Sequence, residues 1–142
     1  MSSFLFAKSE ADGWAAIAKE LETGLAASEP AAGHERLGWL YVTDVLAEDY
    51  GSLVTYLRQT TGIENWAGSV GMGICWLDGV GGGSEAFGRA AAVAMVGIYP
   101  TGGFVVLPRL GGSVAEIPEA HRDWMGRATP PFGVVHGDPM NA

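Results

Sequence analysis

Three residues with the chemistry of a catalytic triad occur in the second half of the chain: Cys75, His136 and Asp138. A thiolate becomes an effective nucleophile when an imidazole lies beside it and a carboxylate orients that imidazole. Three such residues can be picked from almost any sequence, however, and a single cysteine such as Cys75 is more often an inert core residue. We therefore expect no catalytic activity from this triad.

Other enzyme motifs fail at specific positions. A G-x-S-x-G nucleophile elbow around Ser69 would need glycine where Ala67 stands. Lysine occurs only as Lys8 and Lys19, so no P-loop lysine follows the glycine-rich segment 79–88, and a Schiff-base site is not indicated. The sequence therefore favours a protein that binds rather than one that catalyses.

Dinucleotide and metal sites are not indicated either. The glycines of segment 68–73 follow the order G-x-x-G-x-G, whereas a dinucleotide-binding turn needs G-x-G-x-x-G. The three histidines, His34, His121 and His136, have no spacing that is typical of a metal site. We expect no metal and no resident cofactor.

Polar and glycine residues at the ends of predicted strands suggest a ligand site, because open α/β sheets bind ligands beyond the carboxyl ends of their parallel strands. Each also has a structural alternative: Asp44 as a helix cap, the glycines as points of close packing, and His136 with Asp138 as a turn. The predicted ligand-binding residues are Thr43, Asp44, Ser69, Gly71, Gly73, Cys75, His136 and Asp138.

Apolar patterns and turn residues predict the elements that position this site. The first three strands should run parallel, joined by two crossover helices, and the later strands should form an antiparallel meander. The fold class is α/β with a mixed sheet of about six strands in the order βαβαβββαβ; the alternative is an α+β layered sandwich. The expected elements are strand 4–7, helix 9–27, strand 37–42, helix 44–62, strands 66–75, 90–99 and 104–107, helix 118–127 and strand 132–135.

Composition limits the possible partners. The chain has 142 residues, 48% hydrophobic and 17% charged, with a net charge of −8, so one domain with a large core is expected. The negative charge disfavours nucleic acid and anionic membranes. The longest apolar run, 90–99, is too short to span a bilayer. The single cysteine and the lack of a secretory signal in segment 1–8 favour the cytoplasm.

Four segments give the chain a resemblance to a known family. Segments 37–44, 66–75, 91–100 and 136–139 are similar, in sequence, order and spacing, to the N-terminal part of FIST domains. The resemblance implies a cytoplasmic sensory module that binds small ligands such as amino acids, alone or attached to a signalling partner. Residues 1–142 would form a single domain, the first part of a FIST N-terminal domain. FIST proteins continue further, so the chain is expected to be a fragment.

The predicted function is therefore a small-ligand-binding sensory or signal-transduction module without catalytic activity. One alternative is a haem-binding sensor, with His136 as the axial ligand because it follows an apolar strand. Another is a structural or interaction domain. If strand 132–135 has an uncovered edge, a homo-oligomer or the missing C-terminal FIST segment is expected to pair with it.

Overall fold

The computed structural model describes residues 4–26, 29–77, 81–127 and 132–137. The chain divides into two compact units, Met1–Thr101 and Gly102–Ala142. The first unit contains every strand of the described residues and both apolar clusters.

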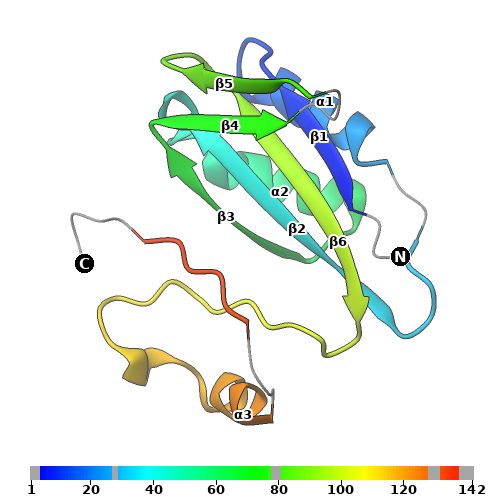
Figure 1. Ribbon diagram of the computed structural model, residues 1–142, viewed down its shortest axis with the longest axis vertical. Coiled ribbons are helices and arrows are strands. Elements are labelled where there is room, and N and C mark those ends of the chain that lie inside the picture. The colour runs from blue at the N-terminus through cyan, green and yellow to red at the C-terminus, as the bar shows by residue number, and fades with distance from the viewer. Residues whose placement is uncertain (1–3, 27–28, 78–80, 128–131, 138–142) are drawn as a thin grey trace. The chain divides into compact units, whose positions relative to one another are not determined.

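A mixed four-stranded sheet forms the centre of the first unit (Figure 1). Its strands follow the order β1 (Leu5–Ser9), β6 (Ala92–Pro100), β2 (His34–Thr43) and β3 (Asn65–Gly71). β2 and β3 are parallel, and β6 is antiparallel to both of its neighbours. β1, β2 and β3 therefore run in the same direction, as predicted, but β6 lies between the first two.

Two helices cover one face of this sheet: α1 (Trp14–Gly24) and α2 (Tyr50–Thr61), which follows a short 3-10 turn at Asp44–Leu46. Their apolar stripes meet the alternate side chains of the strands that point to the same side. α2 ends where predicted, because Gly62 adopts a left-handed conformation with φ 66° and its N–H bonds the carbonyl of Arg58. The largest completely buried side chains of this cluster include Ile17, Leu21, Leu40, Leu53, Leu57, Val42 and Val96.

A small hairpin lies on the opposite face of the sheet (Figure 1). It consists of β4 (Gly73–Leu77) and β5 (Gly83–Phe87), paired antiparallel. The inward side chains Ile74 and Trp76 pack with Val93 of β6 in a second apolar cluster. Helices, central sheet and hairpin therefore form three layers, and the α/β class with a mixed sheet is confirmed.

The predicted glycine-bearing strand 66–75 is two strands. The chain leaves the central sheet after Gly71 and enters the hairpin at Gly73. Met72, between them, is 81% exposed. The reversal is so tight that a β-carbon at Gly71 would lie 2.9 Å from the carbonyl oxygen of Gly73. The absence of a side chain at Gly71 therefore allows the chain to turn from the central sheet into the hairpin.

Strand 90–99 was expected to pair antiparallel with the glycine-bearing segment 66–75. β6 pairs with β1 and β2 instead, so the later strands form no meander. Its buried alanines suit a central position beneath the helices. Segments 104–107 and 132–135 are not strands in the structure; Pro108 follows the first, and Phe132 and Val135 of the second are 89% and 90% exposed. Segment 132–135 therefore offers no strand edge with which a second chain could pair.

The second unit contains a 3-10 turn at Val114–Glu116 and helix α3 (Glu119–Arg127), close to the predicted position. Ile117 is buried, and Trp124 Nε1 donates a 2.7 Å hydrogen bond to the carbonyl of Gly102. In the described part of the chain, every helix is too short or too polar to cross a membrane.

Candidate functional site

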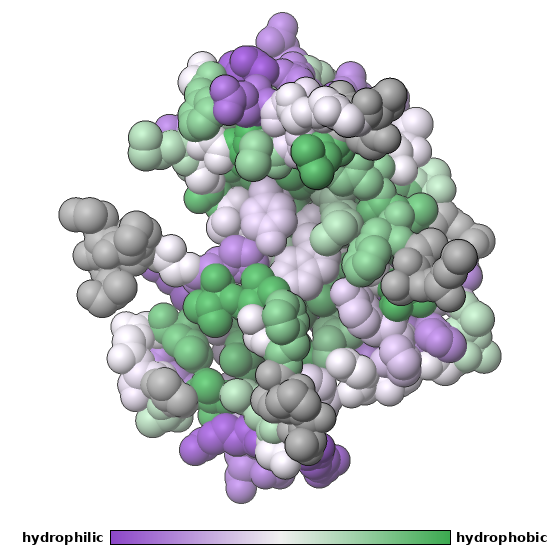
Figure 2. Space-filling view, viewed as in Figure 1, coloured by the Kyte–Doolittle hydropathy of each residue, from purple (hydrophilic) through white to green (hydrophobic). Residues whose placement is uncertain are grey.

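A groove of about 740 Å³ lies in the first unit, between the β4–β5 hairpin and the sheet face that the helices leave open. Its walls are largely apolar. Figure 2 shows pale and green surface beneath the hairpin, where weakly polar and apolar side chains are exposed. The residues that line the groove include Phe6, Tyr41, Trp76, Ser84, Val93 and Met95.

The floor of the groove follows from strand register. Lys8, Val93 and Tyr41 are partners across β1, β6 and β2, and Phe6 and Met95 are partners one row further along. Side chains alternate between the two faces of a sheet, so these odd positions of β6 and even positions of β1 point away from the helices. A strip of largely apolar side chains, with Lys8 at its β1 end, thus crosses the sheet beneath the hairpin.

Trp76 is the most unusual residue of the groove. The side chain is only 6% exposed, yet its indole Nε1 has no hydrogen-bond partner among the described residues. Trp66, by contrast, donates its Nε1 proton to the carbonyl of Ile63 at 2.8 Å. The ammonium group of Lys8 lies 5.0 Å from the centroid of the Trp76 ring, within cation–π range.

Polar side chains at the hairpin complete the site. Ser84 is the register partner of Trp76 and is half-buried, so its hydroxyl lies on the inner side of the hairpin. Cys75 and Glu85 are partners one position along, and both are exposed at the rim. Burial raises the pKa of Tyr41 above its ordinary value of 10.0, so this phenol stays protonated and neutral near pH 7.

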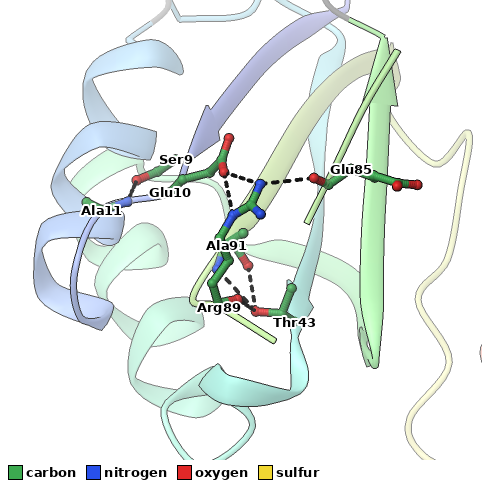
Figure 3. A network of polar contacts seen from close by, with 7 residues as sticks. All are labelled: Ser9, Glu10, Ala11, Thr43, Glu85, Arg89 and Ala91. Carbon is green, nitrogen blue, oxygen red and sulfur yellow. Dashed lines mark hydrogen bonds and ion pairs between the residues drawn. The ribbon is translucent and has the colours of Figure 1, made fainter. Parts of the chain in front are cut away.

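The carboxyl edge of the sheet, where the ligand site was predicted, holds a polar network instead (Figure 3). Thr43 is completely buried; its hydroxyl donates to the carbonyl of Arg89 at 2.7 Å and accepts from the amide of Ala91 at 3.1 Å. The guanidinium group of Arg89 binds the Glu10 carboxylate at 2.7 Å and the Glu85 carbonyl at 3.0 Å. Thr43 therefore joins the end of β2 to the β5–β6 connection.

The other predicted residues are distributed over the molecule. Asp44 is exposed at the start of the 3-10 turn, directly after the Thr43–Gly71 register pair, and Ser69 lies opposite Tyr41. Asp44 does not cap α2, which begins six residues later. Cys75 lines the groove. His136 belongs to the second unit, and Asp138 lies outside the described residues.

The glycines are explained by close packing. A β-carbon at Gly68 would overlap the carbonyl of Leu40 on the neighbouring strand, and one at Gly73 would overlap the ring of Phe87. The backbone at Gly68 also has a φ of 152°, which side-chain-bearing residues rarely adopt. Neighbouring protein groups thus account for these two glycines without a ligand.

Sequence reasoning missed most of the groove. Phe6, Val93 and Met95 line the groove, and Lys8 lies beside Trp76. All four occur in runs that are apolar or mixed, and no motif distinguishes them. The alternation of small and large residues in segment 92–95 was the available signal, since Ala92 and Ala94 face the helices and Val93 and Met95 face the hairpin.

Fold and groove together define a three-layer α/β unit with a ligand-sized groove between sheet and hairpin. No family model, curated protein or solved structure matches the chain. The resemblance to FIST domains therefore stays a prediction.

Proposed function

We propose that the chain is a sensory module that binds a small ligand in the groove beneath the β4–β5 hairpin and has no catalytic activity. The groove carries this proposal. Its volume of about 740 Å³ is in the range of small-molecule sites, which are concave, mostly apolar and fitted with a few polar groups. Trp76, Ser84 and Tyr41 supply such groups between apolar walls.

The distribution of reactive groups supports binding without catalysis. The Cys75 thiol is exposed at the rim of the groove, and the hydroxyl of Thr43 forms hydrogen bonds with the main chain. The groups that remain at the groove can orient a ligand, but none is a thiol or hydroxyl placed beside an imidazole. A signalling output would then follow from occupancy, through a partner protein or a homo-oligomer, in a cytoplasmic setting.

The haem alternative has less support. No histidine lines the groove in the described part of the chain: His34 is exposed at the start of β2, and His121 and His136 belong to the second unit. An imidazole from the groove walls would be the expected axial ligand of a haem bound there. Small organic ligands, amino acids among them, fit the groove better.

A thermal-shift screen of amino acids and other small metabolites tests the proposal. A ligand at 100 times its dissociation constant should add about 2.7 kcal/mol to the free energy of unfolding. Ser84→Phe, which places a ring in the groove, should abolish the shift, whereas Ser52→Phe, on the exposed surface of α2, should leave it intact. A hit that stabilises both variants equally, or no hit at all, would contradict the proposal.

A further inference from the structure

The indole N–H of Trp76 is a hydrogen-bond donor that the described residues leave without an acceptor. Trp66 and Trp124 both donate to main-chain carbonyls, at 2.8 and 2.7 Å. Burying a donor without a partner is unfavourable, and buried tryptophan usually finds one. Because Trp76 is 94% buried and lines the groove, an acceptor atom of a bound ligand is the natural partner.

Lys8 places a positive charge beside this donor. Its ammonium group lies 5.0 Å from the centre of the Trp76 ring and forms no ion pair with any described residue. Arg89, in contrast, is held by Glu10. In a chain with a net charge of −8, a lysine next to a buried donor marks a local site for an anion.

Ser84 adds a third group at the same end of the groove. It is the register partner of Trp76, it is half-buried, and its hydroxyl bonds to nothing in the described ranges. A hydroxyl can donate to a carboxylate oxygen while the indole N–H donates to the other. Two neutral donors and one cation suit a single carboxylate group.

The rest of the groove suits a flat apolar body. Phe6 and Met95 are register partners on the floor, and the thioether of methionine packs well against rings. Val93 and Tyr41 continue the same surface. At the rim, the exposed Glu85 carboxylate would repel a second negative charge on the ligand.

We infer that the groove binds an aromatic monocarboxylate. Its carboxylate accepts from Trp76 Nε1–H and Ser84 and lies near the Lys8 ammonium, and its ring lies between the hairpin and the Phe6–Met95 floor. This inference rests on the proposed function, because it assigns a ligand class to the same groove. The indole N–H and the lysine make the charge of the ligand, rather than its ring alone, the feature that is recognised.

The test compares 2-naphthoate with its neutral isostere 2-naphthamide by titration calorimetry and by NMR of the indole N–H groups. We expect naphthoate to bind at least tenfold more tightly than the amide. The Trp76 indole N–H resonance, identified by its loss in Trp76→Phe, should shift on saturation with naphthoate. The other indole resonances should move less.

The two lysines of the chain provide a matched pair of variants. Lys8→Met should weaken naphthoate binding about tenfold and leave amide binding unchanged, whereas Lys19→Met, on the exposed surface of α1, should affect neither. This result does not depend on how well Trp76→Phe folds. Naphthoate is the probe in each titration.

Four outcomes would overturn the inference. Equal binding of acid and amide, or equal effects of Lys8→Met and Lys19→Met, would show that charge is not recognised, while the groove would still bind small ligands. Failure of naphthoate, with other hits that Ser84→Phe abolishes, would refute the ligand class alone. No binding of any compound would refute the proposed function as well.

Discussion

Gly68 allows two parallel strands to approach at a point where a side chain cannot fit. A β-carbon there would occupy the position of the Leu40 carbonyl, and that carbonyl belongs to β2. Gly51 is the opposite case: a β-carbon would meet nothing within 4 Å on the exposed surface of α2. The same residue type thus has a packing role in the sheet and none in the helix.

Alanine at these two positions should therefore have opposite effects. Gly68→Ala should lower the free energy of unfolding by about 3 kcal/mol or prevent folding, because the backbone of β2 or β3 must move. Gly51→Ala should raise it by about 0.5–1 kcal/mol through helix propensity. Urea denaturation of both variants measures the difference. Similar, small effects of both changes would refute the packing role of Gly68.

Tyr50 should make stability depend on alkaline pH. Its hydroxyl donates to the carbonyl of Leu40 at 3.3 Å, and burial, followed by the neighbouring Tyr41, raises its pKa above the ordinary 10.0. A raised pKa means that the stabilisation is complete below about pH 10, the ordinary pKa of an unfolded tyrosine, and is lost as the pH rises through the folded value.

Tyr50→Phe cannot ionise, so its free energy of unfolding should fall less between pH 9 and 11 than that of the unmodified chain. The stability of this variant should still depend on pH through Tyr41, because burial raises the pKa of that residue too. Chemical denaturation at several pH values gives both curves. Parallel curves for variant and unmodified chain would show that Tyr50 contributes nothing to the pH dependence.

At the scale of elements, one buried threonine connects the end of β2 to the segment between β5 and β6. Thr43 ends β2, and its hydroxyl bonds the main chain at Arg89 and Ala91, between β5 and β6. The backbone amide of Thr43 also donates to the carbonyl of Ala91 at 3.0 Å. The strand order β1-β6-β2 brings these groups together, and the network fixes where the chain enters β6.

Thr43→Val keeps the shape of the side chain but leaves the Ala91 amide and the Arg89 carbonyl without their hydroxyl partner. It should cost about 2–3 kcal/mol, since unsatisfied buried groups carry their full desolvation penalty. Amide exchange at Ala91 should accelerate. Thr55→Val is the control, because Thr55 lies on the exposed surface of α2 and its hydroxyl donates to the carbonyl of Gly51 in the same helix. It should change the free energy of unfolding by less than about 0.5 kcal/mol. Equal costs for both variants would argue against the connecting role.

Local sequence patterns predicted the positions of helices and strands better than the order of the strands in the sheet. The apolar spacing of α2 and the stop at Gly62 are properties of neighbouring residues, so they could be predicted from the sequence. The insertion of β6 between β1 and β2 depends on contacts across the whole unit, which no local pattern records. For the same reason Trp76 could be placed in a core strand, but its unpartnered N–H could not be foreseen.

At the scale of the whole molecule, the strands of both sheets and the two apolar clusters lie within Met1–Thr101. The amide of Thr101, directly after β6, donates to the carbonyl of Gly33, directly before β2, at 2.9 Å. This hydrogen bond links the end of β6 to the start of β2 within the first unit. The groove is also lined entirely by residues of this unit. A unit with its own core is expected to fold alone.

A chain ending at Thr101 should therefore melt cooperatively, give a dispersed amide NMR spectrum, and bind naphthoate within about threefold of the full chain, a difference of under 1 kcal/mol. A chain ending at Ala91 is the control: it lacks β6, the central partner of β1 and β2, and should not fold. Thermal denaturation followed by circular dichroism compares the two. If the chain ending at Thr101 melts without a cooperative transition, or if it folds and no longer binds a ligand that the full chain binds, the first unit is not the independent binding module that its core and groove indicate.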